Sequence, residues 1–208
     1  MAVILHLQAS PRLAQESYSH RGAQAFLDTY RKANPNDRVV TRNVFDSTLP
    51  EFNQLAAEGK YAILHGQPQT PEQAAAWRQV EQTAAEFKAA DKYVVSSPMW
   101  NFGIPHRLKQ YLDVIVQPTL TFSFDPAKGY SGLVTGKPLL LVLARGSEFP
   151  PGSPMDFQRS YLEFIFRFIG FTDLRALLIE PTMAQGREVA AAKLAAAARQ
   201  AAELAATF

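Results

Sequence analysis

Short, almost uninterrupted apolar runs alternate along this chain with longer segments of helical periodicity. At 2–7 and 139–144 the sequence reads AVILHL and LLLVLA, with hydrophobic residues at successive positions and not at every second one. Such runs are typical of strands that are buried on both faces of a sheet. Strands of this kind, separated by helices, predict an α/β fold with a parallel sheet and helices on both of its faces.

Five strands and the helices between them are placed by this periodicity, and we expect an open sheet in the order 2-1-3-4-5. The 208 residues suit one domain over 1–208, because chains divide into two domains mostly at greater lengths. The predicted strands lie at 2–7, 38–44, 92–97, 137–144 and 174–180, and the predicted helices at 17–32, 71–90, 105–116, 157–169 and 186–206, with a further short helix within 51–64.

The composition excludes several classes of protein. There is no cysteine, which rules out disulfides, thiolate nucleophiles and cysteine-bound metals. The 21 basic and 19 acidic residues are spread along the chain, so there is no basic stripe for nucleic acid. The start of the chain lacks the basic residues of a signal peptide, and no apolar run approaches the roughly 20 residues of a membrane span. We therefore expect a cytoplasmic protein that binds neither nucleic acid nor membrane.

Common nucleotide-binding and hydrolase motifs are missing. The nearest match to a P-loop, GLVTGK at 132–137, has one spacer too few and is followed by Pro138. No GxGxxG, HExxH or GxSxG sequence occurs. The four histidines are scattered without a spacing that favours a metal, so no metal site is expected. His6 lies in the first predicted strand and is expected to be a core or strand-end residue.

The predicted sheet fixes where a ligand site must lie. In an open sheet of this order, ligands bind beyond the carboxyl ends of strands 1 and 3, where the strand order reverses. The segments that follow the strands there are 8–19, 97–104 and 144–153. A binding site is therefore expected to be built from these three loops.

The first loop, QASPRLAQESYSH, gathers hydroxyl groups at the start of a helix. Ser10, Ser17 and Ser19 would stand beside free backbone N–H groups and the positive end of the helix dipole. This combination suits a phosphate dianion. The alternative is that Ser17 or Ser19 only caps the helix.

The second loop, SSPMWNFGIP, sets three large apolar side chains in a turn. Met99, Trp100 and Phe102 can form the walls of a slot for a flat aromatic ligand, and the Asn101 amide can bind the polar edge of its ring. The alternative is a subsidiary hydrophobic cluster beneath the loop. Monomers expose few apolar patches of this size, which favours the ligand slot.

The third loop, ARGSEFPPGSP, carries a weaker signal. Gly146 allows close approach of the backbone to a ligand, and Ser147 offers a hydroxyl group. On its own this loop does not indicate a binding site, and it supports one only together with the other two loops.

Several motifs together resemble one family over nearly the whole length. They are Ser10 with Ser17-Tyr18-Ser19, Pro98-Met99-Trp100-Asn101-Phe102 with Leu108-Lys109-Gln110-Tyr111-Leu112-Asp113, GLVTGK at 132–137, Arg145-Gly146, and FIGFTD at 168–173. The chain resembles the FMN-dependent NADH-azoreductases, also described as NADH:quinone oxidoreductases, of the flavodoxin-like superfamily. The P-M-x-N-F motif is the most specific of these features.

The resemblance implies a flavodoxin-like three-layer sandwich that binds FMN. It assigns the FMN phosphate to Ser10, Ser17, Tyr18 and Ser19. It assigns the flavin ring to Pro98, Met99, Trp100, Asn101 and Phe102, and the polar edge of the ring to Ala144, Arg145, Gly146 and Ser147.

The implied reaction is two-electron, ping-pong transfer from NADH or NADPH to planar acceptors, namely quinones, azo dyes and nitroaromatics. No catalytic side chain is expected, because flavin N5 carries the hydride. The family also implies a homodimer whose partner chain roofs each site. Phe122 and Phe124 would belong to that roof. The alternative is that they are ordinary core residues, because their alternation with polar residues equally fits a half-buried strand.

Two departures from the family concern the acceptor more than the cofactor. The third loop reads Ala-Arg-Gly-Ser, where relatives commonly have Ser-Arg-Gly-Gly, and Ile165 stands where a substrate-side Phe can occur. Two other functions stay open: a flavodoxin-type electron carrier and a flavin-binding regulator without turnover. The carrier is disfavoured by a length of 208 residues and a net charge of +2, since such carriers are typically shorter and acidic.

Overall fold

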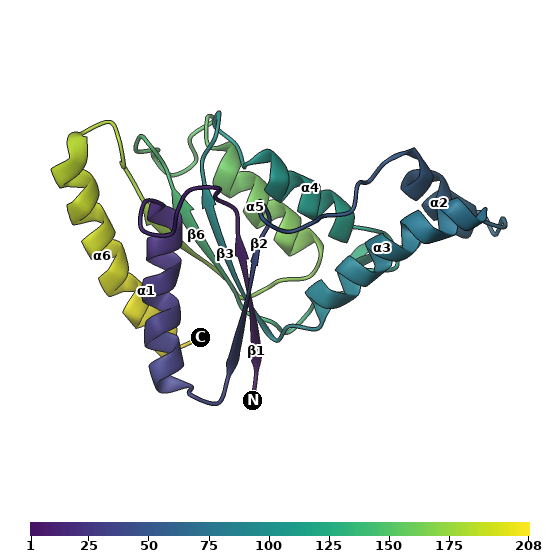
Figure 1. The fold of residues 1–208 in the computed structure, drawn as a ribbon, viewed down its shortest axis with the longest axis horizontal. Helices are drawn as coiled ribbons and strands as arrows, with labels where there is room; N and C mark the ends of the chain where they lie inside the picture. Colours follow the sequence, from purple (N-terminus) through teal and green to yellow (C-terminus); the bar gives the residue numbers. More distant parts are fainter.

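Five parallel strands form the central sheet of the computed structural model, which describes residues 1–208 (Figure 1). Their order, β2-β1-β3-β6-β7, is the 2-1-3-4-5 order predicted from the sequence. The strands are β1 (Val3–Gln8), β2 (Arg38–Asn43), β3 (Lys92–Pro98), β6 (Leu139–Ala144) and β7 (Leu174–Ile179). The predicted strands agree with these bounds to within two residues.

Helices cover both faces of the sheet, which confirms the predicted three layers. Helices α1 (Tyr18–Ala33) and α6 (Gly186–Ala206) lie side by side on one face. Helices α3 (Pro71–Lys88), α4 (His106–Ile115) and α5 (Phe157–Phe168) contribute to the core on the other face. The remaining helix, α2 (Gln54–Leu64), packs on α3 at the end of the molecule farthest from α6 (Figure 1).

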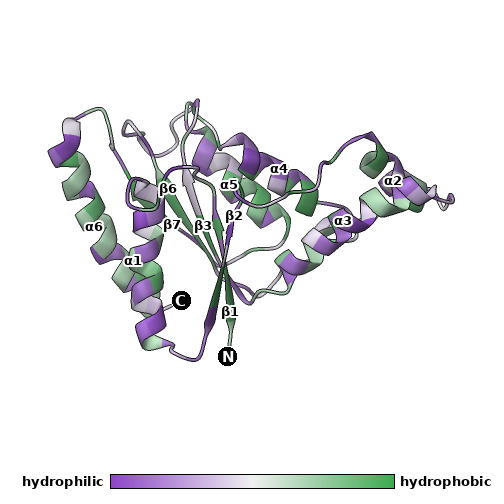
Figure 2. Cartoon of the chain, in the orientation of Figure 1, coloured by the Kyte–Doolittle hydropathy of each residue, from purple (hydrophilic) through white to green (hydrophobic).

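The uninterrupted apolar run in β6 is explained by these two cores. Successive side chains of a strand point to opposite faces, so a strand with helices on both sides needs apolar residues throughout. All six residues of β6 are buried, and Figure 2 shows the hydrophobic interior of the sheet between helices of mixed polarity. Leu139, Leu141 and Leu143 join the core beneath α3, α4 and α5, whereas Leu140, Val142 and Ala144 join the core beneath α1 and α6.

A two-stranded antiparallel sheet was not predicted from the sequence. Strands β4 (Phe122–Asp125) and β5 (Gly129–Gly132) form a hairpin beside the C-terminal end of α5. The rings of Phe122 and Phe168 lie 4.8 Å apart and join the hairpin to that helix. Strands of four residues give too few positions for a periodicity to be recognised.

No helix in the structure combines the length and the apolar character needed to span a bilayer.

The hairpin approaches the end of α5 so closely that one position must be glycine. A Cβ atom at Gly132 would collide with the backbone of Ile169 and Gly170. We expect Gly132→Ala to lower the free energy of unfolding by about 1–3 kcal/mol, since backbone atoms cannot move aside cheaply. Urea denaturation measures the loss, with Ser131→Ala on the same strand as the control. Equal stability of the two variants would contradict this packing.

Candidate active site

The three loops expected to form the site meet at one edge of the sheet. They follow β1, β3 and β6, and the strand order reverses between β1 and β3. The Ala9 N–H donates to the Ser96 carbonyl over 2.8 Å, and the Met99 N–H donates to the Ala144 carbonyl over 2.8 Å. These bonds hold the starts of neighbouring loops against each other. One ligand can therefore touch all three.

Buried hydroxyl groups line the first loop. Ser10, Ser17 and Ser19 are at most 3% exposed, and the Ser17 and Ser19 Oγ atoms lie 3.3 Å apart. Ser17 accepts a hydrogen bond from the His20 N–H, so it caps α1, which is one of the two expected roles. The backbone N–H groups of Tyr18 and Ser19, in the first turn, donate to no protein acceptor. Hydroxyls and free N–H groups thus converge at the positive end of a helix, as a phosphate would require.

A neutral histidine lies beneath this loop. The His6 Nε2 atom is 2.9 Å from the Ser96 Oγ, and the ring is 1% exposed. Burial, followed by the nearby His20 and Arg31, lowers the pKa of His6 to about 3. Burial also lowers the pKa of His20. His6 is thus the buried residue that the sequence indicated. Its side chain bonds to Ser96 of β3. No group of three or more His, Asp or Glu side chains that could hold a metal ion gathers in the chain.

The second loop is a tight turn in an uncommon conformation. Trp100 and Gly103 exchange two backbone hydrogen bonds of 3.0 and 2.9 Å, with Asn101 and Phe102 at the tip. Both tip residues have positive φ, 48° at Asn101 and 66° at Phe102. Asn tolerates this region well, but a non-glycine aromatic there stores of order 1–3 kcal/mol of strain. Such strain is concentrated at functional sites, and the N–H groups of both tip residues have no protein acceptor.

The apolar side chains of this turn are only partly covered. Trp100 packs against Phe45 and His106, with ring centroids 5.6 and 6.1 Å away, yet is 37% exposed. Phe102 meets the edge of Phe149 from the third loop at 6.5 Å and is 50% exposed. The hydrophobic-cluster alternative thus accounts for one side of Trp100. The exposed sides are free to serve as walls.

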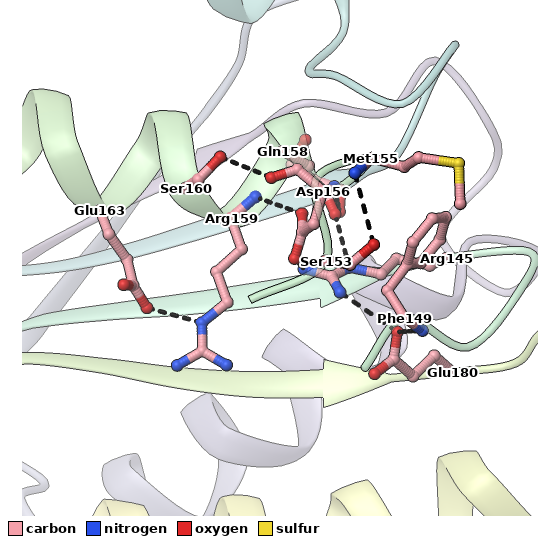
Figure 3. A network of polar contacts seen from close by, with 11 residues as sticks. Arg145, Phe149, Ser153, Met155, Asp156, Gln158, Arg159, Ser160, Glu163 and Glu180 are labelled. Atoms are coloured by element: carbon pink, nitrogen blue, oxygen red, sulfur yellow. Dashed lines mark hydrogen bonds and ion pairs between the residues drawn. The ribbon is translucent and has the colours of Figure 1, made fainter. Parts of the chain in front are cut away.

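The third loop presents its backbone, while its charged side chain is turned inward. The Arg145 side chain is 1% exposed and lies among carboxylates, as Figure 3 shows. Its Nη2 lies 2.7 Å from Asp156 Oδ2, an ion pair without hydrogen-bond alignment, and its Nη1 donates to Glu180 Oε2 over 3.2 Å. Its Nε donates to Gln158 over 3.1 Å. Any contact of Arg145 with a ligand bound at the three loops is therefore left to its backbone.

Asp156, Gln158 and Glu180 were not expected from the sequence as part of the site. They follow Arg145 by 11, 13 and 35 positions, and no motif joins them to it. The one usable signal was an Arg directly after a buried strand, which needs acidic partners when it is itself buried.

The predicted substrate residues do not lie together with the three loops. Phe122 and Ile165 line a pocket of about 370 Å3, which also includes Lys60 and Tyr161. Phe124 is 59% exposed on the hairpin, 5.0 Å from the Tyr130 ring, and is not a core residue. Within one chain, Phe122 and Ile165 thus line a pocket of their own, and Phe124 lies outside it on the hairpin. Their assignment to a substrate site stays a prediction.

The donors of the three loops fit FMN. Hydroxyls and helix N–H groups suit its phosphate, and Met99, Trp100 and Phe102 suit an aromatic ring. The N–H groups of Asn101, Phe102, Gly146 and Ser147 have no protein acceptor and suit the oxygen and nitrogen atoms of the ring edge.

The chain is similar to known proteins over its full length. The model of a family described by a flavodoxin-like fold matches residues 2–205. An FMN-dependent NADH:quinone oxidoreductase of Nitratidesulfovibrio vulgaris is 49% identical, with 100% of both chains covered. One of Desulfotalea psychrophila is 43% identical, with 94% of this chain and 95% of the relative covered.

Solved structures agree with these relatives. The azoreductase from Bacillus anthracis strain Sterne superposes with a TM-score of 0.91 at 30% identity, and all of both chains is covered. An FMN-dependent NADH-azoreductase from the Ames Ancestor strain of Bacillus anthracis, solved in complex with FMN, has a TM-score of 0.86 at 25% identity, with 99% of this chain and 100% of that chain covered.

Proposed function

The chain belongs to the family with the flavodoxin-like fold, and on this basis we propose that it is an FMN-dependent NADH:quinone oxidoreductase that also cleaves azo compounds. The observation that carries the proposal is the meeting of three loops with hydroxyls, apolar walls and free N–H groups at the switch point of the sheet. We further propose that residues 1–208 form one FMN-binding domain.

We propose that each of the three loops binds a different part of FMN. Ser10, Ser17, Tyr18 and Ser19 would bind the phosphate, and Pro98 with the 99–102 turn would hold the ring. Ala144, Arg145, Gly146 and Ser147 would border its polar edge through their backbone. When bound, FMN supplies the hydride chemistry itself, so the protein needs no nucleophile or general base. The apolar walls exclude water, and the N–H donors stabilise negative charge at the ring edge.

The partly exposed rings of Trp100 and Phe102 support a ping-pong reaction. Nicotinamide and acceptor are both planar, and the exposed faces of Trp100 and Phe102 offer one surface for either. Quinones and azo dyes are the acceptors that the names of the relatives support, and we propose nitroaromatics as a further class because they are equally flat. NADPH is proposed as a second donor beside NADH. An enzyme that consumes NADH works where cells keep NADH, so we propose a cytoplasmic location.

An exposed aromatic surface supports the proposed homodimer. Phe124, Tyr130 and Phe164 are 59%, 65% and 66% exposed, and they cluster with Phe122 and Phe168 on the hairpin and α5. Monomers seldom leave apolar patches of this kind in water. A second copy seated here would cover them and bring Phe122, Phe124 and Ile165 to the partner's site.

Purified protein tests the function directly. We expect it to be yellow, to release FMN on denaturation, and to consume NADH when a quinone is added, without any separate reductase. A protein that takes up FMN but gives no turnover would instead be an electron carrier or a flavin-binding regulator. A protein that fails to take up FMN would contradict the proposal.

Asn101 provides a sharper test of where the ring lies. We expect Asn101→Ala to weaken FMN binding about 5- to 30-fold, because it removes an amide partner and puts Ala at a positive φ. Asn101→Gly removes the amide but keeps the backbone conformation, so it separates the two causes. Gln54→Ala is the control, since Gln54 is exposed and bonds only to Glu58. Fluorescence titration with FMN measures all three, and equal affinities would show that the ring lies elsewhere.

A further inference from the structure

The segment after β7 holds the carbonyl groups of the third loop from one side. The Arg145 carbonyl accepts hydrogen bonds from the Thr182 N–H and from its Oγ1, over 2.8 and 2.9 Å. The Gly146 carbonyl accepts from the N–H groups of Met183 and Ala184, over 3.1 and 3.0 Å. Two successive peptide groups are thus fixed by four donors.

Peptide geometry then determines where the opposite ends of these groups point. Both peptides are trans, so each N–H points away from the carbonyl of the residue before it. The N–H groups of Gly146 and Ser147 must therefore point away from Thr182, Met183 and Ala184. Because β6 lies between β3 and β7, that direction leads from the β7 side toward the loop after β3. Neither N–H has a protein acceptor.

Glu180 fixes both ends of the same loop. Its Oε2 accepts from Arg145 Nη1 over 3.2 Å and from the Phe149 N–H over 3.3 Å (Figure 3). Gln158, which accepts from Arg145 Nε, also donates from Nε2 to the Ser97 carbonyl over 3.1 Å. The network therefore ties the third loop to the end of β3, where the second loop begins.

We propose that Thr182 and Glu180 are positioning residues that aim the N–H groups of Gly146 and Ser147 at the edge of the cofactor ring. The inference rests on the function proposed above. A flavin ring that accepts a hydride gains negative charge, and donors held in place in advance stabilise that charge without reorganising. Neither side chain has to touch the ring. Their effect passes through the peptide groups of the loop.

Thr182→Val tests this assignment, because it removes the Oγ1 donor at nearly constant shape. We expect FMN affinity to fall about 3- to 10-fold, the effect of one hydrogen bond. If the affinity for reduced FMN falls about 3- to 10-fold more than the affinity for oxidised FMN, the two-electron midpoint potential falls by about 15–30 mV. Thr182→Ser keeps the hydroxyl and is expected to restore both values. Thr172→Val, at an exposed threonine, is the matched control.

The possible outcomes separate the inference from the function. If the wild type binds FMN but Thr182→Val matches Thr172→Val in affinity and potential, the inference is wrong and the function stands. A drop in apoprotein melting temperature alone would likewise mean a purely structural role and overturn it. Glu180→Gln, compared with Glu188→Gln on α6, repeats the test without the threonine. Because removing a carboxylate near the ring would by itself raise the potential, the readout for this pair is FMN affinity, which should fall in Glu180→Gln alone. If the wild type binds no FMN, the function and the inference fall together.

Discussion

Replacing Arg145 by methionine is expected to lower the free energy of unfolding by about 3–5 kcal/mol, the cost of removing one partner from a buried ion pair. The guanidinium is 1% exposed, and Asp156 and Glu180 are only 13% and 12% exposed in their side chains. Without Arg145, both carboxylates stay in a poorly solvated place with no cation beside them. Methionine keeps much of the volume, so a cavity contributes little to the loss. Urea denaturation of the apoprotein measures it.

A surface arginine and a charge-neutral triple variant are the controls for this loss. Arg31 pairs with Asp28 where the two side chains are 44% and 55% exposed, and Arg31→Met is expected to cost at most about 1 kcal/mol. Adding Asp156→Asn and Glu180→Gln to Arg145→Met removes both uncompensated charges and should recover much of the stability. If Arg145→Met cost no more than Arg31→Met, the buried ion pairs would not be important for folding.

Arg145 also shows what the sequence can and cannot predict about such a site. The position of the loop was predicted, because the apolar run of β6 stops at Ala144 and the predicted sheet order places the end of this strand beside β3. The direction of the Arg145 side chain was not predicted, because it depends on Glu180 and Asp156, which the packing of β7 and α5 brings to Arg145. The periodicity of a sequence indicates which positions are buried, but it does not indicate which residues a buried side chain such as that of Arg145 contacts.

The hairpin of β4 and β5 is a second case in which the sequence pattern did not identify the partner, here the partner of a strand. Phe122 and Phe124 alternate with polar residues, a pattern that fitted a roof over a ligand and a half-buried strand equally well. The strand exists, but Phe124 and its cross-strand neighbour Tyr130 on β5 stay 59% and 65% exposed. Sequence patterning identifies such a strand only when its partner strand is recognised too, and Gly129–Gly132 contains two glycines and no apolar run.

Placing a negative charge at Ser17 is expected to weaken FMN binding about a thousandfold while leaving the apoprotein folded. Asp caps a helix about as well as Ser and favours the positive end of its dipole, so Ser17→Asp should fold normally. A carboxylate about 4 Å from a bound phosphate would repel it by roughly 4 kcal/mol at an effective dielectric constant near 20. That energy corresponds to about a thousandfold loss of affinity.

Ser17→Asn is the matched control, because asparagine caps equally well, has nearly the shape of aspartate and carries no charge. The ratio of FMN affinities between the two variants therefore reports the repulsion alone, and melting temperatures verify that both keep α1 capped. Riboflavin, which lacks the phosphate, should bind both variants equally. If Ser17→Asp bound FMN within tenfold of Ser17→Asn, Ser17 would be a helix cap and nothing more, and the phosphate would have to lie away from the first turn of α1. A large difference in FMN affinity between the two variants, with no difference in riboflavin affinity, would place the phosphate beside this hydroxyl. Only the combination of Ser17→Asp with FMN brings two negative charges together.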